Sequence, residues 1–179
     1  MRHVANGAIA AGSVLLCLLA LPTRFSGMEL LGIGPNWLLI WVVVWSIKRS
    51  VWQGAIAGLV LGLLQDGLVF SHPTHTLSLI VVGAITARLQ QQRYIQEDFI
   101  SIALIVFGMT VLAETILAIQ FSLQTIGQPM AVVFRSLNKI WAYHQYVTLA
   151  SALLSSLWAP ALSFPLNFLW EKFGSESEI

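Results

Sequence analysis

Long apolar runs, separated only by short polar or proline-containing stretches, limit most strongly what this chain can fold into. Of its 179 residues, 57% are hydrophobic and 9% are charged, whereas a soluble domain carries about 25% charged residues. A surface so poor in charge excludes a water-soluble enzyme, and the net charge of +1 gives no basic face for nucleic acid. The sequence therefore predicts an integral membrane protein that contacts lipids and has no nucleic-acid partner.

The lengths of the apolar runs predict six transmembrane helices. One crossing takes about 20 mostly apolar residues, so six crossings use roughly 120 and leave no room for a separate soluble domain. We expect one all-α transmembrane domain over residues 1–179, with approximate spans 4–21, 29–47, 51–70, 74–89, 99–123 and 146–170. A polar stretch from Gln124 to Gln145 is expected before the last span, where Pro160 and Pro165 predict a kink or a broken last turn.

The distribution of Lys and Arg predicts the orientation. With a cytoplasmic amino terminus, the inner side carries Arg2, Lys48, Arg49, Arg88, Arg93 and Lys172, and the outer side carries Arg24, Arg135 and Lys139. Loops on the cytoplasmic side of membrane proteins are enriched in these residues. Both termini are therefore expected in the cytoplasm.

Three glycines and an aspartate recur at every fourth position of the third expected span: Gly54, Gly58, Gly62 and Asp66. This spacing places them along one helix face, where glycines let another backbone approach closely. We interpret the glycines as a packing surface rather than a ligand contact. An intramembrane carboxylate is costly unless it is paired or hydrogen-bonded. Asp66 is thus expected to be a buried polar strut whose partner is an arginine, a backbone donor or a water, with proton or ion transport as the alternative.

Trp37, Trp41 and Trp45 also recur at every fourth position, in the second expected span. Tryptophan commonly anchors helix ends at the membrane interface, but Trp41 falls in mid-span. The row therefore predicts a bulky face packed on neighbouring helices or lipid, with stacking on a base or sugar as the alternative. Glu114, the second intramembrane acid, is expected to meet a polar partner inside the bundle.

The sequence offers no catalytic or metal-binding constellation. Cys17 is the single cysteine, and His72 and His75 have no cysteine or carboxylate at a zinc-like spacing. No Gly-x-Ser-x-Gly motif or other nucleophile–base pair is present. We therefore expect no enzyme, no catalytic residue, no metal and no cofactor.

Two motifs in the first half of the chain resemble the family of the rod shape-determining protein MreD. They are Gly34-Pro35-Asn36-Trp37-Leu38-Leu39, followed by Trp45 and a short basic turn, and Gly58-x-x-x-Gly62-Leu63-Leu64-Gln65-Asp66. That family has a Pro-Asn-Trp-like start of its second span and a small-residue face followed by Gly-x-x-x-Asp in its third. The likeness extends to Trp158-Ala159-Pro160. The chain departs from the family at Ser71-His72-Pro73-Thr74-His75, where glycines are usual, so no contact of that loop is carried over.

The resemblance implies a non-enzymatic scaffold of the cell-elongation machinery in the bacterial inner membrane. The implied partners are MreC, which is a single-span protein, and indirectly the MreB filament, RodA and its transpeptidase partner, which build lateral peptidoglycan. The implied fold is similar to the six-helix substrate-binding subunits of ECF transporters. Candidate residues for helix packing or partner contact are Asn36, Trp37, Trp41, Trp45, Gly54, Gly58, Gly62, Asp66 and Glu114.

That fold similarity also gives the alternative function, a vitamin-type binding subunit of an ECF-like importer. Such a subunit would need a ligand pocket lined by several polar side chains and an Ala-x-x-x-Ala docking motif on its first span. Ala8 and Gly12 give only a small-x-x-x-small match, which is common by chance.

Overall fold

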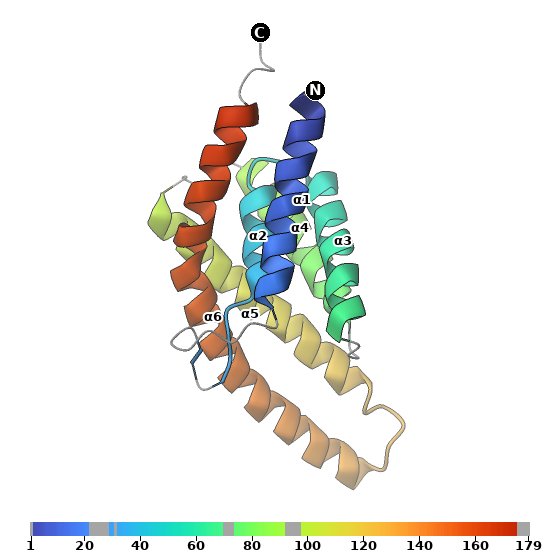
Figure 1. Ribbon diagram of the computed structural model, residues 1–179. Helices are drawn as coiled ribbons and strands as arrows, with labels where there is room; N and C mark the ends of the chain where they lie inside the picture. Colours follow the sequence, from blue (N-terminus) through green and yellow to red (C-terminus); the bar gives the residue numbers. More distant parts are fainter. Residues whose placement is uncertain (1, 22–28, 31, 70–73, 92–97, 175–179) are drawn as a thin grey trace.

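A computed structural model describes residues 2–21, 29–30, 32–69, 74–91 and 98–174, and these residues form an all-helical bundle (Figure 1). In chain order the helices are α1 (Arg2–Ala20), α2 (Trp37–Ser46), α3 (Val51–Val69), α4 (His75–Gln91), α5 (Phe99–Leu123) and α6 (Met130–Gly174). Within the described residues, three helices are long and apolar enough to cross a membrane, in the segments Val51–Leu68, Phe99–Leu123 and Met130–Phe168. Shorter apolar helices cover Ala10–Ala20, Trp37–Ser46 and His75–Leu89. The prediction of an all-α membrane bundle is thus confirmed.

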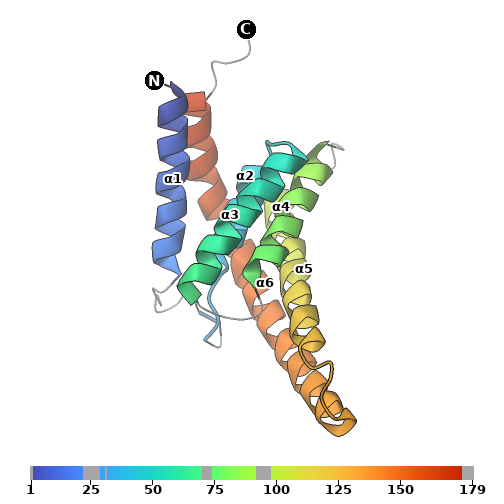
Figure 2. The same cartoon turned by 90° about the vertical axis from the view of Figure 1, so that its right-hand side faces the viewer.

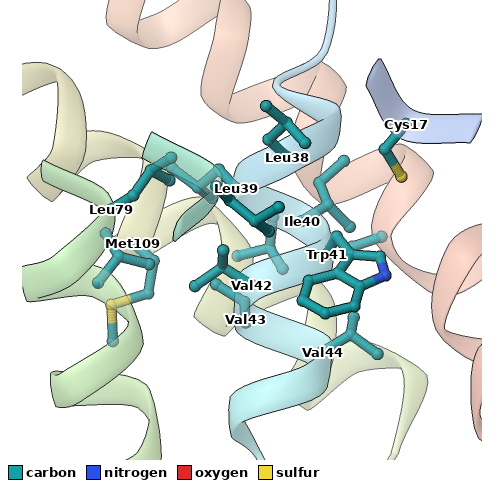
Figure 3. Close-up of a cluster of buried hydrophobic side chains, with 14 of the residues drawn as sticks. Cys17, Leu38, Leu39, Ile40, Trp41, Val42, Val43, Val44, Leu79 and Met109 are labelled. Carbon is teal, nitrogen blue, oxygen red and sulfur yellow. The ribbon is translucent and has the colours of Figure 1, made fainter. Parts of the chain in front are cut away.

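Helix α2 lies at the centre of the bundle and contacts the other five helices. Its sequence is apolar on every side, and such a helix is stable only where it is surrounded. Residues 38–44 are at most 4% exposed, and Figure 3 shows their side chains radiating from α2 toward its neighbours. The core of the molecule is therefore built around its shortest helix.

The ten helical residues of α2 are far fewer than the expected span 29–47. Before the helix, Leu30 and Ile33 form a small antiparallel bridge, and Gly32 adopts a φ of 82°. Pro35 then disfavours helical geometry in the residue before it. At about 1.5 Å per residue, α2 rises about 15 Å, which is half of the hydrocarbon core.

Helix α6 begins at Met130, well before the expected start of the last span at Tyr146, so the later part of the polar stretch 124–145 is helical. The helix runs through 45 residues, about 68 Å at the usual helical rise. Residues 130–145 contain neither Pro nor Gly, and the partly buried Val133, Leu137, Ile140 and His144 recur at helical spacing. The polar residues of this segment lower its average hydropathy, and this average concealed the periodicity.

The α5–α6 hairpin extends beyond the lower ends of the other helices in Figures 1 and 2. Its turn includes Gly127, which adopts a φ of 97°, a conformation that glycine adopts at little cost. Helix α6 remains helical through Pro160 and Pro165, so the last turn is not broken, and Figure 1 shows α6 changing direction between its orange and red parts. The described ends of α1 and α6 lie side by side at the same end of the bundle (Figure 2).

Candidate functional site

The Pro-Asn-Trp segment caps α2 and attaches it to α6. The Asn36 side-chain oxygen accepts a hydrogen bond from the Leu39 N–H at 3.1 Å, so Asn36 is the N-cap residue of α2. The Asn36 N–H donates to the Ser155 hydroxyl of α6 at 3.0 Å. Beside it, the rings of Trp37 and Trp158 meet with centroids 5.8 Å apart and planes tilted by 60°. The Pro-Asn-Trp motif is thus in contact with Trp158 of α6, which belongs to the Trp158-Ala159-Pro160 segment where the likeness to the MreD family continues.

The other two tryptophans of the row stack on each other along α2. The rings of Trp41 and Trp45 have centroids 5.8 Å apart and an interplanar angle of 13°. The Trp41 indole N–H donates to the Ser13 hydroxyl of α1 at 2.9 Å, which gives the buried ring a polar partner. The Arg49 guanidinium lies 5.2 Å from the centroid of Trp45, a cation–π geometry. The three tryptophans of α2 therefore contact α6, α1 and the Arg49 guanidinium, which follows the end of α2.

The glycine face of α3 lies directly against α4. A Cβ atom added at Gly54 would overlap the backbone of Gly83, one at Gly58 would overlap the backbone of Leu79, and one at Gly62 would overlap Thr76. Figure 2 shows the two helices side by side. These contacts are to backbone atoms, which cannot move aside as a flexible side chain can. The three predicted glycines therefore lie where the backbones of α3 and α4 approach too closely for a Cβ atom.

Asp66 ends this face and caps the start of α4. Its carboxylate accepts hydrogen bonds from the His75 N–H at 2.7 Å, the Thr76 N–H at 3.1 Å and the Thr76 hydroxyl at 2.6 Å. The His75 Nδ1 lies 3.0 Å from the same carboxylate. The first N–H groups of a helix have no intrahelical partner, and the helix dipole favours a negative charge there. Of the three partners that the sequence left open, the structure provides backbone donors.

Glu114 lies apart from the glycine face, on the wall of a cavity of about 380 Å³ between α4, α5 and α6. The polar residues that line this cavity are His75, Glu114, Tyr143 and His144. His75 therefore touches both surroundings, since it binds Asp66 on one side and faces the cavity on the other. One histidine thus contacts Asp66 and lines the same cavity as Glu114.

A second hollow, an apolar groove, lies between α1 and α3 and is floored by Trp41 and Trp45 of α2. Its volume is about 550 Å³, and Gln53 is its one polar lining residue within the described parts of the chain. The walls include the small residues Ala10, Ala11 and Ala57. The α3 residues that line the groove are not the glycines that meet α4, so α3 uses one face for α4 and presents another to the groove.

Of the α6 residues near these motifs, sequence reasoning named only the segment Trp158-Ala159-Pro160, through the family likeness, and it did not identify the packing row to which Ala159 belongs. A row of small, buried residues follows the inner face of α6: Thr148, Ser151, Ser155, Ala159 and Ser163. Their spacing of three and four is the usual signal of close packing between membrane helices, and it was available in the sequence. The pairing of Asp66 with Thr76 had no such signal, because it depends on how the chain turns between α3 and α4.

Comparison with known proteins identifies the family. The family described as rod shape-determining protein MreD matches residues 8–172 of the chain. Comparisons with curated proteins and with solved structures each gave no match. The match covers α2 to α5 completely and most of α1 and α6, and it includes both motifs. This chain belongs to the MreD family of rod shape-determining membrane proteins.

Proposed function

We propose that this chain serves rod shape determination, the role of its family, as a non-enzymatic scaffold that binds an MreC-like single-span protein. Its candidate residues support a structural role. Asn36 caps α2, the glycines pack on α4, and Asp66 holds the start of α4 through three hydrogen bonds and a contact with the His75 Nδ1. The hydrogen bonds of the Asp66 carboxylate are directed at the first residues of α4, which supports a packing role.

The observation that carries the proposal is the apolar groove between α1 and α3. In a bilayer, helices associate by close van der Waals packing, which small residues permit. Ala10, Ala11 and Ala57 provide such positions on both walls. Gly12 is exposed on α1 but is not among the described residues that line the groove. One transmembrane helix of the MreC-like partner is the occupant whose shape and apolar surface suit this groove. Ala8, the other half of the small-residue pair, lies outside the residues whose side chains are described.

Recovery of the partner tests this contact. Ala11→Phe places a ring in the groove, and because Ala11 is exposed, the change leaves the packing of the chain itself intact. We expect the amount of MreC-like protein that co-purifies from native membranes to fall several-fold. Ala161→Phe, at an exposed position of α6 outside the groove, is the matched control and should recover the wild-type amount. Equal recovery with both variants would reject the groove, and no recovery with wild type would reject the partner.

Through this partner we propose that the chain supports lateral peptidoglycan synthesis together with MreB, RodA and its transpeptidase partner. The test is complementation of rod-shaped cells depleted of their own MreD. Wild type should restore rod shape and incorporation of a fluorescent D-amino acid along the side walls, and Ala11→Phe should restore neither fully. Rod shape without side-wall incorporation would separate the chain from wall synthesis.

We further propose that the chain crosses the bacterial inner membrane several times with both termini in the cytoplasm. The described ends of α1 and α6 share one end of the bundle, as an even number of crossings requires. Arg49, near the end of α2, lies against the Trp45 ring, a pairing typical of the membrane interface.

A binding subunit of an ECF-like importer is the second candidate function, because the cavity beside Glu114 is lined by four polar side chains. Such a subunit should co-purify with ATPase subunits or with a tightly bound vitamin. Mass spectrometry of the purified complex distinguishes the two functions, since a scaffold brings shape proteins and an importer subunit brings ATPases.

A further inference from the structure

The cavity beside Glu114 has the size and the lining of a small ligand site. Its volume of about 380 Å³ lies within the usual range of roughly 300–1,000 Å³. The apolar part of its wall is formed by Leu117, Ala118, Phe121, Ile140 and Val147. The MreC-like partner is proposed to occupy the groove between α1 and α3, so it does not fill this cavity.

Glu114 is the polar group of this cavity that has no internal partner. Within the described parts of the chain, the structure gives its carboxylate no hydrogen bond and no ion pair. The neighbouring hydroxyls of Thr110 and Thr115 donate to backbone carbonyls instead. An unpaired acid in such a setting is expensive, and in membrane helices it commonly marks a binding function.

The other polar groups at the cavity are already engaged or carry no positive charge. The His144 Nδ1 lies 3.0 Å from the Thr148 hydroxyl, and His75 is held by Asp66. No Lys or Arg is among the described lining residues. The described residues also hold no cluster of three or more His, Cys, Asp or Glu that suits a metal ion. No described lining residue therefore supplies Glu114 with a free positive counter-charge, which leaves this position open to a ligand.

We propose that this cavity binds a primary ammonium group carried on an apolar stem. Glu114 supplies the counter-charge, the faces of Phe121 and Tyr143 attract the cation, and the aliphatic wall receives the stem. Two sources carry this chemistry: a free alkylamine, or the ethanolamine headgroup of a phospholipid with its acyl chains along α5 and α6.

Thermal unfolding of the full chain in a mild detergent, with hexylammonium as the probe, tests the proposal. A saturating amine should raise the melting temperature by about 5 °C, whereas hexanol and hexanoate should not. Glu114→Gln keeps the shape of the side chain and removes its charge, so it should weaken binding about tenfold or more. Asp98→Asn is the matched control, because it removes a carboxylate from the start of α5 that makes no capping hydrogen bond. It should respond as wild type does.

Native mass spectrometry distinguishes the two sources. Retention of phosphatidylethanolamine over phosphatidylglycerol by wild type, lost in Glu114→Gln, assigns the site to the lipid headgroup, whereas a hexylammonium response without lipid retention assigns it to a free amine. If Glu114→Gln does not fold, Leu117→Trp, which fills the cavity and keeps the carboxylate, should lose the same binding. Equal responses of wild type, Glu114→Gln and Leu117→Trp, or no response to either ligand by wild type, would overturn the proposal.

Discussion

The Asp66 carboxylate accepts two hydrogen bonds from Thr76, one from its backbone N–H at 3.1 Å and one from its hydroxyl at 2.6 Å. Together with the His75 N–H, these bonds tie the end of α3 to the start of α4. The glycine face brings the same two helices together along their length. One helix pair thus combines a close backbone contact with a polar clamp at its end.

Replacing Asp66 should destabilise the bundle in a graded way. Asn retains one acceptor oxygen but turns an amide donor toward the donors of α4, so we expect a loss of about 1 kcal/mol. Leu leaves all of these donors without an acceptor, and the expected loss is about 2–3 kcal/mol. Unfolding in detergent, followed by tryptophan fluorescence, measures both.

Cell-shape complementation and partner recovery should follow the same order, with Asn tolerated and Leu impaired. Asp98→Asn, the same substitution where no side-chain capping bond exists, should match wild type. Normal shape, stability and partner recovery with Asp66→Leu would contradict the role of the clamp.

The glycine face should distinguish crowded from open positions when alanine is introduced. At Gly58 a Cβ would overlap the backbone of Leu79, so Gly58→Ala should cost about 1–3 kcal/mol of stability. At Gly67 a Cβ would meet nothing within 4 Å, so Gly67→Ala should be neutral or stabilise by up to about 1 kcal/mol through helix propensity. The melting temperature should therefore fall for Gly58→Ala and stay unchanged or rise for Gly67→Ala. A stable Gly58→Ala protein would mean that α3 and α4 are farther apart than the structure has them.

The cap of α2 predicts a difference between two small residues at position 36. Ser retains an oxygen that can accept from the Leu39 N–H, whereas Ala leaves that donor unpaired beside the buried core. We expect Asn36→Ala to be about 1 kcal/mol less stable than Asn36→Ser. Both variants keep the backbone N–H that donates to Ser155, so the comparison isolates the side chain. Equal stability of the two would mean that water replaces the cap.

The proposed orientation predicts which positions an impermeant thiol reagent reaches. In a Cys17→Ser background, Asn138→Cys places an exposed thiol on the lower part of α6 and should be labelled in intact spheroplasts. Ser50→Cys, exposed between α2 and α3, should be labelled only after lysis. The reverse pattern would place both termini outside, and labelling of both positions in intact spheroplasts would contradict the assignment of crossings.

The fold class, the number of helices and the positions of most helices could be predicted from the lengths of the apolar runs. This is because a helix that crosses a bilayer needs a long apolar segment. The lengths of α2 and α6 could not be predicted in this way. Helix α2 is shorter than the expected span because Gly32 and Pro35 interrupt an otherwise apolar segment. The length of an apolar run does not show where the backbone departs from helical geometry. The first third of α6 was read as polar because its apolar positions are dispersed around the helix, with those facing α5 spaced at three and four.

The sequence could predict which candidate residues share a helix face, but it could not predict which residues they contact. Spacing placed Gly54, Gly58 and Gly62 on one face, and the structure lays that face on α4. The partners of Asn36 and Trp37 lie more than a hundred positions away on α6, and a single sequence carries no record of such distant contacts. The likeness to ECF transporter subunits came from the family resemblance alone, and it stays a prediction.

The brevity of α2 has a consequence for how the protein is made. A helix that covers about half of the hydrocarbon core cannot act as an independent crossing when it leaves the ribosome. Its surroundings are completed by α4, α5 and α6, which are synthesised later, and its Asn36 N–H reaches an acceptor only when Ser155 has been translated. We therefore expect the amino-terminal half to reach its final depth after the rest of the chain has entered the bilayer. Release of a truncated chain before α6 should leave it vulnerable to membrane proteases.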